Sequence, residues 1–250
     1  MTRAGPEWKD CRVRLTVVGC SPAWPNPGGA QSGYLVEGSG RLLLDCGPGV
    51  LARLREREPW PRIDAIAITH FHLDHWGDLV PWVWGSVFGP GGTVEGPRLL
   101  VPPGGTALLR EFGERLGAAD MFDRAFRLFE YRDGEPFEAA GFEVTAVRVP
   151  HYAIDSYAFR VEDGSRVLAY SGDSGPSERL GELARDADLF VCEATLLDGE
   201  PDPRGHLSLD EAQAAFADSG ARRLLVTHRP GERAVPDGVE QAHDGLVLTL

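Results

Sequence analysis

The segment Thr69-His70-Phe71-His72-Leu73-Asp74-His75 places three of the seven histidines of the chain and one aspartate within six residues. It follows directly on the apolar run Ile63–Thr69 (IDAIAIT), which is typical of a buried strand. In an extended chain, side chains two residues apart point to the same side, so we expect His70 and His72 to lie together at a strand end. Asp74 and His75 come next, where the chain turns after the strand, and their side chains can face a metal ion other than the one near His70 and His72. Imidazole and carboxylate groups together suit Zn²⁺ or a related divalent metal. We therefore interpret the segment as part of a metal site and not as a chance cluster of surface histidines.

Three further candidate ligands occupy the same kind of position. Each follows a run that is expected to form a strand: His151 after 142–149, Asp173 after 166–170 and His228 after 223–227. A single histidine at a strand end is more often structural. Four separate strand-end positions in one chain nevertheless favour a shared metal site.

The order of expected elements indicates one α/β domain that spans residues 1–250 and is built of two similar halves. No linker separates the halves, and the Gly89–Gly92 loop is too short to be one. A capping box at Ser208 and Glu211 marks the start of one helix. Strands are expected at 12–19, 33–37, 41–45, 63–69, 98–101, 126–131, 142–149, 156–161, 166–170, 189–192, 223–227 and 246–250, and helices at 50–57, 79–88, 106–116, 177–185, 208–217 and 237–243.

The composition is that of a soluble globular protein, with 42% hydrophobic and 25% charged residues in 250. A net charge of −13 argues against a broad surface for nucleic acid or for an anionic membrane. The N-terminus has no apolar stretch typical of a signal peptide, and no window reaches 18 apolar residues, so a cytoplasmic location is expected. The four cysteines form no Cys-x-x-Cys pair and lie mostly in or beside apolar runs, as buried thiols do: Cys11, Cys20, Cys46 and Cys192.

These motifs resemble the metallo-β-lactamase fold superfamily across essentially the whole chain, which implies a four-layered αββα sandwich. Four later signatures are similar to the ribonuclease Z-like branch: Ser171-Gly172-Asp173, Cys192-Glu193-Ala194-Thr195, His206-Leu207-Ser208 and Leu225-Val226-Thr227-His228. Within that branch, three segments match best a small actinobacterial group of atypical cyclic-nucleotide phosphodiesterases: Val17-Val18-Gly19-Cys20, Ser32-Gly33-Tyr34-Leu35 and Asp45-Cys46-Gly47.

The resemblance implies two divalent metal ions, with Zn²⁺ expected and Mn²⁺ or iron as alternatives. The first ion would be bound by His70, His72 and His151, and the second by Asp74, His75 and His228, with Asp173 bridging both. Two such ions would activate a hydroxide between them. The local charge is then about +1, since +4 from the metals meets −3 from two aspartates and hydroxide. Such a centre can attract a small anion even in an acidic protein.

The resemblance also implies roles in catalysis. Asp74 would orient the hydroxide and accept its proton, and His206, supported by Glu193, would contact the substrate and protonate the leaving alkoxide. Trp76 and Tyr157 are candidates for substrate binding beside the metals. Packing of the tryptophan-rich segment against the sheet is the alternative for Trp76, and His243 is expected to be a surface residue.

The function expected from these features is metal-dependent hydrolysis of a small phosphodiester of the cyclic-nucleotide type. A lactone or carboxylic-ester hydrolase is an alternative, because the same metal pair can activate water against a carbonyl. A ribonuclease Z-type tRNA 3′-end endonuclease is disfavoured, because the 22 positions from His151 to Asp173 leave no room for a tRNA-binding arm. A non-catalytic metal-binding module is least favoured, since all seven ligand positions are filled. The expected partner is a small anionic or ester substrate, with no membrane or large nucleic acid, and a homodimer stays open.

Overall fold

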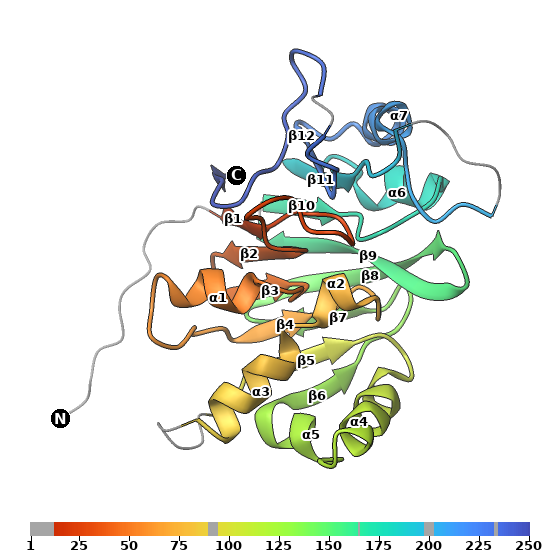
Figure 1. The fold of residues 1–250 in the computed structure, drawn as a ribbon. Coiled ribbons are helices and arrows are strands. Elements are labelled where there is room, and N and C mark those ends of the chain that lie inside the picture. The colour runs from red at the N-terminus through yellow and green to blue at the C-terminus, as the bar shows by residue number, and fades with distance from the viewer. Residues whose placement is uncertain (1–12, 90–94, 165, 198–202, 233–234) are drawn as a thin grey trace.

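Two β-sheets pack face to face, and helices cover the outer face of each (Figure 1). The computed structural model describes residues 13–89, 95–164, 166–197, 203–232 and 235–250. The four layers confirm the expected αββα fold class.

The first sheet has seven strands and takes most of its sequence from the N-terminal half. Its strands are β1 (Arg14–Gly19), β2 (Gly33–Glu37), β3 (Arg41–Leu44), β4 (Ala65–Ala67), β5 (Arg98–Val101), β6 (Arg127–Glu130) and β13 (Val247–Thr249), in the order β13-β1-β2-β3-β4-β5-β6. The helices of this half are α1 (Val50–Arg55), α2 (Leu73–Trp76), α3 (Leu79–Val87), α4 (Gly105–Arg115) and α5 (Met121–Ala125).

The second sheet has six strands from the C-terminal half. They are β7 (Pro136–Ala139), β8 (Phe142–His151), β9 (Ile154–Asp163), β10 (Arg166–Tyr170), β11 (Leu189–Glu193) and β12 (Leu224–Thr227), in the order β12-β11-β10-β9-β8-β7. Helices α6 (Glu178–Leu183) and α7 (Leu209–Ser219) cover its outer face.

Alternation along the strands explains why both faces of the first sheet are buried. In β1, Leu15 and Val17 belong to the core between the sheets, whereas Val18 packs in the cluster that includes α1 and α3. The core between the sheets also takes Phe142 and Val144 from β8 on the opposite sheet. One continuous apolar cluster therefore joins the two halves, and its burial is the main force that holds the sheets together.

The direction of the strands places the loops that carry the candidate site residues at one edge of the two sheets. Strands β3 and β4 are parallel, and so are β10, β11 and β12. Strand β8 runs in the same direction as β10, because β9 pairs antiparallel with both. The carboxyl ends of these strands carry Asp45, the His70–His75 segment, His151, Asp173, Glu193 and His228.

The expectations for individual elements are mostly met, with one clear error. No helix forms at 237–243: the N–H of Val226 donates to Glu240, and the N–H of Ala242 donates to Val226. Residues near Gln241 therefore run alongside β12, where the backbone groups of an edge strand offer hydrogen bonds that outweigh local helix propensity. Three short elements were not expected from the sequence: α2, α5 and β7.

The three cysteines in the described residues are free and buried, as expected: Cys20, Cys46 and Cys192. Cys11 and most of the Gly89–Gly92 loop lie outside the described residues. Among the helices of the described part of the chain, none has the length and apolar character needed to cross a bilayer.

The capping box of α7 provides a test of local stability. Ser208 Oγ accepts from the N–H of Glu211 at 3.4 Å, and the Glu211 carboxylate accepts from the N–H of Ser208 at 2.9 Å. Ser208→Ala should lower the free energy of unfolding by about 1 kcal/mol, because the helix N–H of Glu211 loses its partner. Urea denaturation measures the change. Gln213→Ala, at an exposed position in the same helix, should change stability by less than about 0.5 kcal/mol, and equal losses in the two variants would contradict this role of the cap.

Candidate metal centre

The structure brings all seven expected ligands together in two adjoining clusters. In each cluster, one donor atom per residue lies within 4.8 Å of the others. The first cluster is His70, His72, His151 and Asp173, and the second is Asp74, His75, Asp173 and His228. Asp173 belongs to both, so the residues fall into the two groups that the family resemblance implied.

The two carboxylate oxygens of Asp173 face different histidines. Oδ2 lies 3.8 Å from Nε2 of His70 and 3.8 Å from Nε2 of His151. Oδ1 lies 3.3 Å from Nε2 of His75 and 3.5 Å from Nε2 of His228. This arrangement suits a carboxylate that bridges two ions.

Close backbone packing holds the histidine segment in place. His72 is extended and precedes the single helical turn α2, which turns Asp74 and His75 back toward the sheet. The N–H of Cys46 donates to the carbonyl of His75 at 2.7 Å. Position 47 must be glycine here, because a β-carbon would lie 1.9 Å from the carbonyl oxygen of Asp74.

The Asp45 carboxylate is the main anchor behind the ligands. It accepts from the Nδ1–H of His75 at 2.7 Å, the hydroxyl of Tyr170 at 2.8 Å and the N–H of Thr69 at 2.8 Å. Its backbone has a positive φ of 60°, as does that of His228 at 56°. Such conformations are costly for residues other than glycine and concentrate at functional sites.

Two more histidines have their rings oriented through Nδ1. The Nδ1–H of His151 donates to the carbonyl of Gly205 at 2.6 Å. Nδ1 of His228 lies 2.8 Å from Thr195 Oγ1, whose hydroxyl in turn donates to Glu193 at 2.7 Å. These contacts leave Nε2 of each ring directed at the cluster, as metal-binding histidines require.

The donor set fits divalent metal ions. Within the described residues, the buried Nε2 atoms of His70 and His75 have no hydrogen-bond partner, which is costly unless something else binds them. Burial lowers the pKa of His70, His72 and His151, so these rings stay neutral and able to coordinate. Five imidazoles and two carboxylates are suitable ligands for zinc and for related ions.

The carboxylates remain ionised despite their burial. Burial raises the pKa of Asp74 and Asp173, but the nearby histidines, His228 and His75 foremost, outweigh it and hold both pKa values well below the usual range. For His75, burial lowers the pKa, and the charges of Asp173 and Asp45 more than offset this and raise it. The negative charge that favours a proton on His75 also favours a metal cation at the same place.

His206 lies beside both clusters and is held by Glu193. Its Nδ1–H donates to Glu193 Oε1 at 2.8 Å, and its ring lies 4.9 Å from that of His151 and 5.6 Å from that of His228. Glu193 is fully buried and also accepts from the N–H of Ser174. His206 is partly exposed, and so is His72, so the cluster opens to solvent on their side.

Two substrate-binding predictions need correction. Trp76 is only 3% exposed: its ring packs against Phe112 and Phe122, and its indole N–H donates to the carbonyl of Phe71. Tyr157 is also 3% exposed and packs against Tyr131 in the core between the sheets. Side chains this deeply buried have no free face for a ligand. The packing alternative for Trp76 therefore holds, and His243 is exposed as expected.

Sequence patterns assigned no role to Asp45, Thr195 or Tyr152, which all border the site. A signal existed for Asp45, because it is the last residue of the predicted strand 41–45 and so lies at a strand end, as the candidate metal ligands do. Thr195 follows β11 by two residues, but a threonine there has no distinctive pattern. Tyr152 adjoins His151, and its ring lies 5.1 Å from that of His151.

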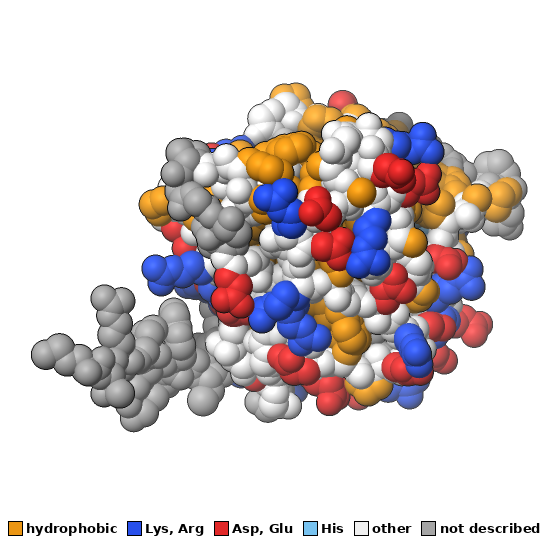
Figure 2. Space-filling view, turned by 90° about the horizontal axis from the view of Figure 1, so that it is seen from below, with side chains coloured by type: hydrophobic (Ala, Val, Ile, Leu, Met, Phe, Trp, Pro, Cys, Tyr) orange, Lys and Arg blue, Asp and Glu red, His pale blue; other side chains and the backbone are white. Residues whose placement is uncertain are grey.

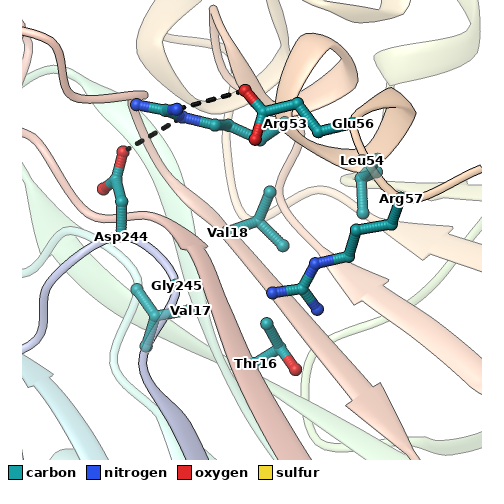
Figure 3. Close-up of a pocket in the computed structure, with 9 residues that line it drawn as sticks. All are labelled: Thr16, Val17, Val18, Arg53, Leu54, Glu56, Arg57, Asp244 and Gly245. Carbon is teal, nitrogen blue, oxygen red and sulfur yellow. Dashed lines mark hydrogen bonds and ion pairs between the residues drawn. The ribbon is translucent and has the colours of Figure 1, made fainter.

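A separate pocket of about 220 Å³ lies between α1, β1 and the chain near the C-terminus (Figure 3). In it, Arg53 forms ion pairs with Glu56 at 3.2 Å and with Asp244 at 3.7 Å. The residues that line this pocket belong to neither metal cluster: Thr16, Val17, Val18, Arg53, Leu54, Glu56, Arg57, Asp244 and Gly245.

Replacement of the anchor behind His75 should weaken metal binding. Asp45→Asn removes the charge that holds the His75 ring, so Zn²⁺ affinity should fall about 10- to 100-fold. Competition with a chromophoric chelator measures the affinity, and circular dichroism checks that the variant folds. Asp64→Asn is the matched control, since that exposed carboxylate accepts from the N–H of Arg41 and belongs to neither cluster. The same Zn²⁺ affinity in both variants would contradict the role of Asp45.

Comparison with known sequences identifies the family. Residues 40–229 match the family model described as Beta-lactamase superfamily domain. The chain is 31% identical to the probable metallo-hydrolase YhfI of Bacillus subtilis, over 87% of each chain. It is 37% identical to the uncharacterized protein ML1173 of Mycobacterium leprae, over 92% of this chain and 82% of that one. It is also 29% identical to ribonuclease Z of Myxococcus xanthus, over 86% of each chain.

Solved structures agree with this assignment. The crystal structure of YhfI from Bacillus subtilis has a TM-score of 0.83 at 25% identity and covers 95% of this chain and 99% of that chain. A diphosphatase from the PhnP family has a TM-score of 0.73 at 24% identity, over 95% and 97% of the two chains, which is a likeness of fold. The chain therefore belongs to the beta-lactamase superfamily, in its ribonuclease Z-like branch, and is a metallo-hydrolase.

Proposed function

We propose that the protein hydrolyses a small phosphodiester of the cyclic-nucleotide type with the help of two divalent metal ions, most simply Zn²⁺. His70, His72, His151 and Asp173 would hold one ion, and Asp74, His75, His228 and Asp173 the other. Bound there, such cations lower the pKa of a water molecule and withdraw charge from a phosphoryl oxygen.

The observation that carries the proposal is the pair of His206 and Glu193 beside the clusters. Burial by itself lowers the pKa of His206, but the charge of Glu193 and its hydrogen bond outweigh burial and raise that pKa to about 9. Glu193 therefore favours the protonated form of this imidazole. A protonated imidazole next to the metals can neutralise an anionic phosphate oxygen and donate its proton to the leaving alkoxide.

Asp74 supplies the complementary role. Its carboxylate is ionised, and its Oδ2 lies 3.1 Å from Nε2 of His228 in the second cluster. An ionised carboxylate in this position can orient a water molecule and accept its proton. The chain thus offers a proton acceptor and a proton donor on one site, as hydrolysis of an ester requires.

Two features support a small substrate over a polynucleotide. Between His151 and Asp173 the chain forms β9 and β10, which pair with each other along the length of β10, and the described residues there leave no segment for a tRNA arm. Figure 2 shows arginine and acidic side chains interspersed on one face of the molecule. Many arginines of the described residues are paired, such as Arg98 with Glu138 and Arg110 with Asp123. Tracking a polyanion requires several unpaired cations in a row.

Hydrolysis of a model diester tests the proposal. Protein loaded with Zn²⁺ or Mn²⁺ should cleave bis(p-nitrophenyl) phosphate and 3′,5′- or 2′,3′-cyclic nucleotides, because the site combines metal ligands with a proton donor. Release of p-nitrophenolate and chromatography of the nucleotides measure turnover, with metal content determined on the same sample. Chelation should abolish it. Turnover of a lactone or acyl-ester panel without any phosphodiester cleavage would mean that the proposed substrate class is wrong.

Removal of the proton donor should separate chemistry from metal binding. His206→Ala should lower kcat for a cyclic nucleotide by about 10²- to 10⁴-fold, since the leaving alkoxide loses its acid. Metal content, measured by atomic absorption, should stay near that of the wild type. His243→Ala, an exposed histidine away from the site, is the control and should change neither quantity. If metal is lost from His206→Ala, the residue holds the centre together instead.

A further inference from the structure

Tyr152 occupies a turn position that normally belongs to glycine. His151 at the end of β8 pairs with Ile154 at the start of β9, which leaves a two-residue turn of Tyr152 and Ala153. Tyr152 has a positive φ of 47°. A positive φ at the first position of such a turn favours glycine, and a bulky side chain there is uncommon. The chain therefore bears a backbone strain at a position adjacent to a metal ligand.

The strained turn places an aromatic ring at the mouth of the site. The Tyr152 ring lies 5.1 Å from the ring of His151 and 5.5 Å from that of His206. It also packs on the backbone of Gly205, where a β-carbon would lie 2.3 Å from the ring. Gly205 is the residue whose carbonyl orients His151. Tyr152 nevertheless stays 49% exposed, so part of its surface faces solvent.

A surface hollow of about 400 Å³ runs along the same turn. Its lining includes His151, Tyr152 and Ile154, together with Arg148 and Arg179. Both arginines are already paired, Arg148 with Asp155 and Arg179 with Asp133. The exposed apolar surface of this hollow includes the large side chains of Ile154 and Tyr152. It therefore suits a flat, uncharged group and not a second phosphate.

We infer that Tyr152 is the residue that binds the flat ring of the substrate, a nucleobase or an aryl group, when the phosphodiester lies on the metals. This inference rests on the proposed function and adds a determinant of specificity to it. The Tyr152 ring lies next to His206, the proposed proton donor. The flat ring of the substrate would therefore contact Tyr152 while its leaving oxygen contacts the neighbouring His206. Stacking on an aromatic side chain tolerates different bases, because every base has a π-face.

Two substrates with the same cyclic phosphodiester test the inference. One is adenosine 3′,5′-cyclic phosphate, and the other is methyl ribofuranoside 3′,5′-cyclic phosphate, which lacks the base. Tyr152→Ala should raise KM for the adenosine substrate roughly 5- to 100-fold, as expected for a lost base–aromatic stack. The KM for the base-free substrate should change less than about twofold, and kcat should change little for either. Tyr152→Phe should restore the wild-type KM values.

Both variants keep a β-carbon at the same positive φ, so backbone strain is matched between them. Thermal unfolding and metal content confirm that each is folded and loaded. Trp84→Ala is the control for an exposed aromatic on α3, 42% exposed and packed against Phe88 at 5.0 Å, and should leave both KM values unchanged.

Equal losses on both substrates, a loss in kcat alone, or a Tyr152→Phe variant as impaired as Tyr152→Ala would overturn the inference. If the wild type cleaves neither cyclic phosphate but hydrolyses carboxylic esters, the proposed function fails separately. The same variants are then compared on phenyl acetate and methyl acetate, where only the aryl substrate should respond to Tyr152→Ala.

Discussion

The buried carboxylate of Asp45 is the contact on which the arrangement of the site depends. It lies at the end of β3 in the first sheet and accepts the hydroxyl of Tyr170 from β10 in the second. The same carboxylate holds the Thr69 backbone and the His75 ring. A buried charge is stable only when its hydrogen bonds are satisfied, so these donors must meet at one point. That requirement fixes the position of one sheet relative to the other at the edge where their candidate metal ligands meet.

A second buried carboxylate, that of Glu193, holds the side chains of His206 and His228 in place. Glu193 accepts from Ser174, Thr195 and His206, and Thr195 passes this support on to His228. One buried charge thus orients His228, a candidate metal ligand, through Thr195, and it raises the pKa of His206, the proposed proton donor. Loss of the Glu193 charge would therefore change both the orientation of His228 and the proposed proton transfer by His206.

Much of the site was predictable because its residues follow one rule. Polar residues directly after apolar strands meet at the carboxyl edge of a sheet, and this rule identifies His151, Asp173 and His228 from the sequence. Local patterns failed where long-range packing decides the outcome. Residues around Gln241 lie along β12, so no helix forms at 237–243, and Trp76 turns into the core although it follows His75.

The fold class, the family and the seven candidate ligands can be read from the amino-acid sequence, because strand periodicity and a dense histidine motif are local properties. The three-dimensional packing was needed to establish that the two oxygens of Asp173 face different histidines. It was also needed to place Tyr152, and not Trp76 or Tyr157, at the mouth of the site. The physical reason is that these outcomes depend on contacts between segments far apart in the chain. His151 meets Gly205, and Tyr170 meets Asp45, only after the two sheets have packed.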